Sequence, residues 1–198
     1  MKLLRPFLIA AALTVTATAQ PAPGAKPAAP GTPPAPGATA AKPKPFSAGD
    51  TNAYIKVAES MQFQLSLSQT LQGKFKDSEP EIVALGRKIH AEMTKAWTPG
   101  VDLAQLRAVD NKKIPMTLSK NDKAALAKVG TIKEEKKWLV AYFDLFAKES
   151  KKSATDAEKI AKAVQDADLK AYIEKIAALL KSQSEAIEAK EKEVKARK

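Results

Sequence analysis

Apolar residues recur at three- and four-residue spacing along most of the chain after Asp50. This spacing places apolar side chains on one face of an α-helix. No segment alternates apolar and polar residues as a half-buried strand would, and valine and isoleucine do not cluster. The pattern therefore predicts an all-α fold, most simply an antiparallel four-helix bundle with one short crossover helix.

Two long helices are predicted in the first half of this region. The first has Asp50 as its expected N-cap and ends within residues 73–78. Its inner residues are Tyr54, Ala58, Met61, Leu65, Leu71 and Phe75. The second follows an expected N-cap at Ser78, with Pro80 in its first turn, where a missing N–H costs nothing. Its inner residues are Ile82, Leu85, Ile89, Met93 and Ala96 or Trp97. Pro99 is expected to kink or break this helix, and a helical pattern resumes over residues 101–109.

The second half begins with a loop over residues 111–115 and a short helix from Ser119 to about Val129. Thr131 and Glu134 have the spacing of a capping box and predict the start of a third long helix. Its inner residues are Trp138, Tyr142, Leu145 and Phe146. A polar join at residues 150–155 is expected to end it, followed by helices over residues 157–164 and about 166–196. The last helix has a long apolar seam of Leu169, Tyr172 or Ile173, Ile176, Leu179 or Leu180, Gln183, Ile187 and Val194.

The first 45 residues have a different pattern. Lys2 and Arg5 precede a short apolar run, and the small residues Ala17 and Ala19 follow it. These features predict a signal peptide over residues 1–19, cleaved after Ala19, and export to the periplasm or the medium. The run is too short for a membrane-spanning helix, so no transmembrane span is expected after signal removal. Residues 20–45 are rich in proline and alanine and predict a disordered linker, which leaves residues 46–198 as a helical bundle domain.

The charge of the chain is +11, and it contains no cysteine. Five of the cations and none of the acids precede Phe46, so the predicted domain has 28 cations and 22 acids, a net charge of +6. This balance is typical of a solvated lysine-rich surface, or of weak attraction to anionic lipid headgroups or cell-wall polymers. A nucleic acid partner is not expected, because no cluster combines basic and aromatic residues.

Candidate catalytic chemistry is sparse. The only histidine is His90, and the residue three before it is Arg87, so the Glu-x-x-His pair of a di-iron bundle is absent. We expect His90 to lie on the surface flank of its helix. Glu185, Glu188 and Glu191 are expected to form a solvated face supported by ion pairs. We therefore predict no catalytic, cofactor-binding or metal-binding residue, no cofactor, and no enzymatic activity.

A set of short motifs nevertheless occurs in a familiar order. They are Tyr54-Ile55-x-x-Ala58, the stretch Glu92–Ala96, Lys113-Ile114-Pro115-x-x-Leu118-Ser119, Trp138-Leu139 and the stretch Asp168–Tyr172. With the signal and the proline-rich linker before them, they resemble the exported bacterial family named domain of unknown function 4142. The resemblance covers about residues 48 to 190 and implies a ferritin-like four-helix fold.

The chain departs from this family at the positions that suggest a metal centre. Family members commonly have a glutamate in the first helix and a histidine in each of the next three long helices. The alignment places Gln64 at the glutamate, Met93 and Phe146 at the second- and third-helix histidines, and Ser182 at the fourth-helix histidine. The chain thus resembles a divergent member that lacks the family's histidines.

These features predict a non-catalytic exported protein of the bacterial cell envelope with a structural, stress-related or interaction role. A periplasmic chaperone-like or polyanion-binding helper is one alternative, and a carboxylate-only metal-binding ferritin-like protein is another. The expected partner is an unknown envelope protein or an anionic surface. The cations Lys190, Lys192, Lys195, Arg197 and Lys198 either bind polyanions or complement the dipole of a helix C-terminus. Gln183 is either a polar core position or the point where the seam opens, and Trp97 is a candidate exposed contact.

Overall fold

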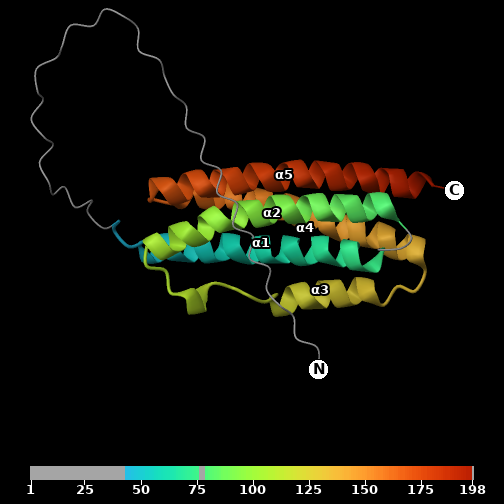
Figure 1. Ribbon diagram of the computed structural model, residues 1–198, viewed down its shortest axis with the longest axis horizontal. Helices are drawn as coiled ribbons and strands as arrows, with labels where there is room; N and C mark the ends of the chain where they lie inside the picture. Colours follow the sequence, from blue (N-terminus) through green and yellow to red (C-terminus); the bar gives the residue numbers. More distant parts are fainter. Residues whose placement is uncertain (1–42, 76–78, 198) are drawn as a thin grey trace, which may run out of the picture. The chain divides into compact units, whose positions relative to one another are not determined.

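The computed structural model describes residues 43–75 and 79–197, and its regular structure is entirely helical. Four long helices are α1 (Ala48–Lys74), α2 (Pro80–Leu106), α4 (Glu135–Ala163) and α5 (Ala167–Ala196). Between them lie the 3₁₀ turn Asn111–Lys113 and the short helix α3 (Lys120–Gly130). The predicted all-α class is confirmed (Figure 1). The predicted signal peptide, residues 20–42 of the linker and Ser78 lie outside the described residues.

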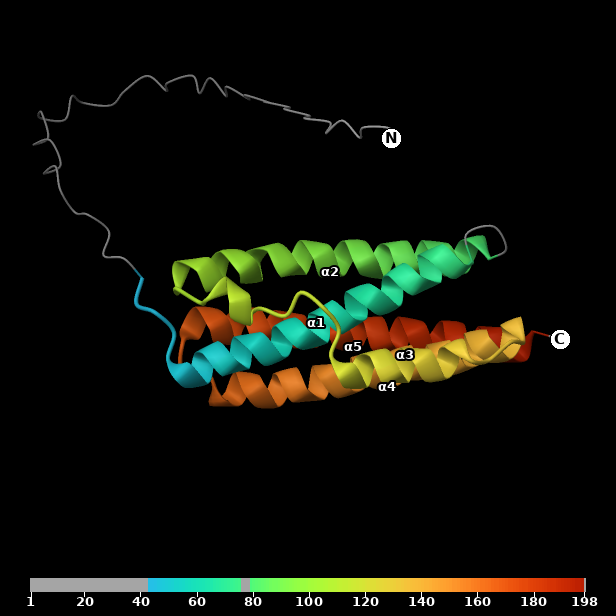
Figure 2. The same ribbon diagram turned by 90° about the horizontal axis from the view of Figure 1, so that it is seen from below.

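The four long helices pack side by side, with α1 along α2, α4 along α5, and α3 against α4 (Figure 2). At one end of the long helices, the backbone N–H of Phe46 donates to the carbonyl of Arg107 at 3.2 Å. The Arg107 guanidinium pairs there with Asp168 at 2.6 Å, which joins the end of α2 to the start of α5. At the opposite end, Arg197 pairs with Glu79 at 2.7 Å and joins the end of α5 to the start of α2.

The core consists of the apolar faces predicted from the spacing. Buried residues among those predicted include Tyr54, Met61, Leu71, Phe75, Ile82, Ile89, Met93, Trp138, Tyr142, Phe146, Leu169, Ile173, Ile176, Leu180, Ile187 and Val194. Aromatic rings form one continuous cluster between α1 and α4. Trp138 stacks on Tyr142 with ring centroids 4.6 Å apart, and Phe75 lies 5.4 Å from Trp138. Offset aromatic pairs of this kind contribute beyond the area that they bury.

The predicted polar join at residues 150–155 is wrong, because α4 continues through it to Ala163. Ser150 is fully buried, Ser153 is 8 % exposed, and Ala154, Ala157 and Ala161 are also buried. Serine is only slightly less favourable than alanine in a helix interior. Small side chains also let α5 approach α4 closely. The buried serines of this stretch therefore lie on a packing face of α4 and do not end the helix.

Three predicted helix ends also differ from the structure. Ser47, and not Asp50, caps α1, since its hydroxyl oxygen accepts from the Asp50 N–H at 3.0 Å. The capping box of Thr131 and Glu134 does not form, because the Thr131 hydroxyl donates to the Lys128 carbonyl. Pro99 does not break α2, which runs through it to Leu106. One proline removes one hydrogen bond, and the packing of the rest of the helix outweighs that loss.

Helix α2 lies tightly against α1 at Gly86. A Cβ atom at this position would lie 2.9 Å from the Ser68 carbonyl oxygen and 3.1 Å from the Leu71 Cβ. These atoms cannot move without shifting the α1 backbone. Gly73 in α1 is the opposite case, since nothing lies within 4 Å of a Cβ built there.

We predict that Gly86→Ala lowers the free energy of unfolding by about 1–3 kcal/mol, because the added methyl group overpacks the α1–α2 contact. Gly73→Ala is the matched control and should raise it by up to about 1 kcal/mol, because alanine is the better helix former. Urea denaturation followed by circular dichroism measures both values. Equal stability changes in the two variants would contradict the close contact at Gly86.

Candidate functional site

The interior of the helix packing contains polar side chains midway along the helices. Gln64 on α1 and Ser150 on α4 are fully buried, and the Ser150 hydroxyl donates to the Gln64 Oε1 at 2.7 Å. The Gln64 Nε2 has no hydrogen-bond partner. A buried amide donor without an acceptor costs stability. This pair is therefore a polar feature that hydrophobic packing alone does not explain.

Two further polar contacts connect α2 to its neighbours. Gln183 on α5 is 2 % exposed, and its Nε2 donates to the Glu92 carboxylate at 3.2 Å. Gln183 is thus a polar core position, the first of the two alternatives above. His90 is half-buried, and its Nδ1 lies 3.3 Å from the hydroxyl of the buried Ser68. The histidine contacts α1 and is not simply a solvated surface residue.

The positions aligned with the metal centre of the resembled family are mostly interior. Gln64, Met93 and Phe146 are each 0 % exposed, whereas Ser182 is exposed and its neighbour Gln183 is buried. Within the described residues, no three His, Cys, Asp or Glu side chains lie close enough together to hold a metal ion. The aligned positions that face inward carry an amide, a thioether and a phenyl ring.

Buried tyrosines lie beside this interior. Burial raises the pKa of the Tyr54 hydroxyl to about 12. Burial also raises the pKa of Tyr142, whose hydroxyl donates to the Leu67 carbonyl at 2.6 Å. Desolvation disfavours the phenolate in both cases, so each hydroxyl stays protonated at neutral pH, and that of Tyr142 is a structural donor.

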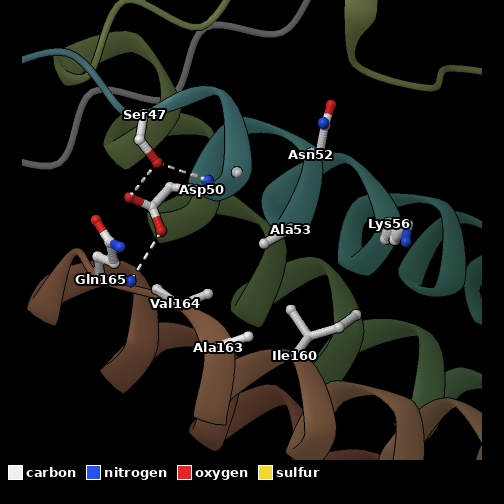
Figure 3. Close-up of a pocket in the computed structure, with 10 residues that line it drawn as sticks. Ser47, Asp50, Asn52, Ala53, Lys56, Ile160, Ala163, Val164 and Gln165 are labelled. Atoms are coloured by element: carbon white, nitrogen blue, oxygen red, sulfur yellow. Dashed lines mark hydrogen bonds between the residues drawn. The ribbon is translucent and has the colours of Figure 1, made fainter.

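A pocket of about 250 Å³ lies where α1 begins and α4 ends (Figure 3). Its main polar group is Asp50, which is 5 % exposed. One oxygen of the Asp50 carboxylate accepts from the Ser47 hydroxyl at 2.9 Å, and the other accepts from the Gln165 backbone N–H at 2.9 Å. Figure 3 shows the carboxylate between these two partners, while Asn52 points away from it. The group ties α1 to the α4–α5 connection and is fully engaged in doing so.

The basic C-terminal residues are largely neutralised by internal partners. Lys190 pairs with Glu81 at 2.9 Å and with Glu193 at 2.7 Å. These carboxylates raise the pKa of the Lys190 ammonium, Glu193 more strongly than Glu81. Arg197 pairs with Glu79 at 2.7 Å.

A second pair at this end corrects the predicted solvated face. Glu191 is only 9 % exposed and pairs with Lys195 at 2.5 Å. Glu191 is therefore a buried partner of a cation, whereas Glu185 is exposed and Glu188 is half-buried. The cations of this region mainly fasten the end of α5, and Lys198 lies outside the described residues.

Large exposed apolar side chains occur at two places in the described residues. Leu106 is 60 % exposed and lines a groove between α2 and α5 together with Leu103 and Tyr172. Met116 is 72 % exposed and lies in the connection between α2 and α3. Trp97, the aromatic residue expected as a contact point, is half-buried and packs against the core.

The excess positive charge of the domain is concentrated in one stretch. Residues 111–137, which we call the basic segment, contain eight lysines and three acids, a net charge of +5. The whole region 46–198 has 28 cations and 22 acids, a net charge of +6. In the basic segment, Lys137 pairs with Glu134 at 2.6 Å, and Lys136 donates to the Arg197 carbonyl. The other six lysines make no ion pair within the described part of the chain: Lys112, Lys113, Lys120, Lys123, Lys128 and Lys133.

Helix α3 has its three lysines at exposed positions, and Lys128 also lines a pocket beside Asp144 and Lys148 of α4. Val129 is buried and Leu126 is half-buried, and both pack into the core on the side of α4. Lys120, Lys123 and Lys128 are exposed. With 3.6 residues per turn, these three positions fall on the half of the helix opposite Val129. The basic segment is therefore an ordered cationic surface fixed by its apolar face.

Reading the sequence by helical period did not identify this surface. Helical periodicity predicts which residues of a helix face inward, but it does not compare the net charge of one segment with that of another. A count of lysines and acids in windows of about 25 residues would have found it. The same count shows why the C-terminal end is less basic than it seems, because acids alternate with the cations there.

The comparisons with known proteins give no further assignment: the chain matches no family model, no curated protein and no solved structure. Among the helices that the structure describes, none is long and apolar enough to cross a membrane.

We predict that Ser150→Ala lowers the free energy of unfolding by about 1–3 kcal/mol, because it leaves the buried Gln64 amide without its hydroxyl partner. The double variant Gln64→Met, Ser150→Ala should recover most of this loss, because both polar groups are then replaced by apolar ones. Exposed Ser182→Ala is the control and should change stability by less than about 0.5 kcal/mol. Urea denaturation of the unmodified protein and the three variants measures these free energies of unfolding. A double variant no more stable than Ser150→Ala would refute the pairing of Gln64 with Ser150.

Proposed function

We propose that this chain is a non-catalytic exported protein of the bacterial cell envelope that acts by binding an anionic surface through its basic segment. The fold we propose for it is an antiparallel four-helix bundle of the ferritin-like class, with α3 as the crossover helix. The order of motifs that resembles domain of unknown function 4142 supports this class. The helix ends that meet also support it, since the start of α2 lies at the end of α5.

The observation that carries the proposal is the charge of the basic segment. Six of its lysines make no ion pair within the described residues. Lys148 and Lys159 differ from them, because each lies within reach of an acid on its own helix. Charges that are paired locally produce little field at a distance, whereas a cluster of one sign attracts a surface of the other sign. At physiological ionic strength this attraction extends about 8 Å, so it acts mainly on partners in contact with the segment.

The packing of the basic segment supports the same function. Ile114 is 8 % exposed and Val129 is 8 % exposed, so the segment is attached to the core before α3 and in its last turn. Ser119 caps α3 by accepting from the Asp122 N–H at 3.2 Å. Lysines held on an ordered element lose less conformational freedom on binding than lysines on a disordered tail. A surface fixed in this way is suited to adsorption on an extended anionic polymer or layer.

The test uses the purified protein and dextran sulfate as a soluble polyanion. The variant Lys120→Gln, Lys123→Gln, Lys128→Gln should weaken binding by about tenfold or more at about 0.1 M salt, because each lysine near an anionic surface contributes up to about 1 kcal/mol. The control variant Lys162→Gln, Lys170→Gln, Lys181→Gln removes the same charge from exposed positions of α4 and α5. It should weaken binding by less than about threefold. Equal losses in both variants would mean that only the net charge matters and would reject the basic segment as the binding surface.

A further inference from the structure

The apolar residue Met116 lies among the lysines of the basic segment. Its side chain is 72 % exposed, more than that of Leu106, the other large apolar side chain that is exposed in the described residues. Lys112 and Lys113 precede it, and Lys120 follows it at the start of α3. An apolar side chain that is exposed to water in this segment gains no stabilisation from burial.

The backbone around Met116 is held in place. Ile114 is buried on one side, and Leu118 is half-buried and packs against the core on the other. The Met116 carbonyl also accepts a hydrogen bond from the Gln62 Nε2 on α1 at 3.4 Å. The loop is therefore attached before, at and after Met116, while the methionine side chain itself remains outside.

From this placement, and resting on the proposed function, we infer that the anionic partner is a phospholipid bilayer and that Met116 inserts between its headgroups. A soluble polyanion offers partners for the lysines only. A bilayer of anionic lipids offers phosphates for the lysines and, a few ångströms deeper, an apolar layer for the methionine. The unbranched, flexible thioether side chain adapts readily to such a disordered apolar layer.

Helix α3 itself stays on the protein. Leu126 and Val129 face α4, so its apolar side is already used in the fold. The contact with lipid is then electrostatic along α3 and apolar only at Met116. Binding should be reversible and sensitive to salt, because one inserted side chain is a weak anchor.

The first experiment compares vesicles of phosphatidylglycerol and phosphatidylcholine with vesicles of phosphatidylcholine alone. Met116→Ser should weaken binding to the anionic vesicles by about three- to tenfold, as expected for losing part of the burial of one apolar side chain. Its binding to dextran sulfate should not change. Leu106→Ser is the matched control, since it removes an exposed apolar side chain from the α2–α5 groove, and it should bind both partners like the unmodified protein.

The second experiment reports insertion directly. The chain has no cysteine, so Met116→Cys and Leu106→Cys can each be labelled with a polarity-sensitive nitrobenzoxadiazole dye at a single site. On binding to anionic vesicles, the dye at position 116 should shift its emission to the blue and be quenched by spin-labelled lipid. The dye at position 106 should keep the emission that it has in water.

The outcomes separate the two proposals. If the Lys120, Lys123 and Lys128 substitutions weaken binding to dextran sulfate but the position 116 dye stays in water, the insertion is wrong and the basic segment still binds anions. Binding to dextran sulfate without any binding to anionic vesicles also overturns the lipid partner. If those lysine substitutions weaken binding to neither partner, the proposed function itself fails.

Discussion

The packing of α4 along α5 is the contact on which the rest of this molecule depends. Small side chains lie at this interface, since the Ser184 hydroxyl of α5 donates to the Ala147 carbonyl of α4 at 3.4 Å and Ala154 lines a pocket with Ser184. They allow the two helices to lie close together. Because α4 is unbroken from Glu135 to Ala163, this contact can continue along its length. α1 and α2 form the second close pair, with a tight contact at Gly86. The two pairs then bury one apolar core, and hydrophobic burial of this kind is the main favourable term in folding.

The distribution of charge follows from this architecture. Helix ends that meet bring cations and acids within reach of each other, as Arg107 with Asp168 and Arg197 with Glu79. The basic segment is different, because it connects the two pairs of helices and only one side of it faces the fold. Lysines on its outer side have fewer acidic neighbours. Among the described residues, the segment that connects the two helix pairs is thus the one in which positive charge is concentrated.

Much of the fold could be predicted from the spacing of apolar residues. Tyr54, Met93 and Ile176 were assigned to the core from period alone, and all three are buried. The wrong predictions concern residues whose structural role depends on tertiary contacts. The serines at 150 and 153 are as compatible with a loop as with a close helix contact, and only the position of α5 distinguishes the two. The burial of Glu191 likewise depends on how α5 packs against its neighbours and on its pairing with Lys195.

The most direct test of the central claim is to map which lysines an anionic bilayer covers. The purified protein is acetylated briefly with limiting reagent, with and without phosphatidylglycerol vesicles, and each site is quantified by mass spectrometry. We predict protection of Lys113, Lys120 and Lys128, with no change at Lys162, Lys170 or Lys181, all of which are exposed in the free protein. Uniform protection over the surface, or protection centred on α5, would contradict the assignment of the binding surface to the basic segment.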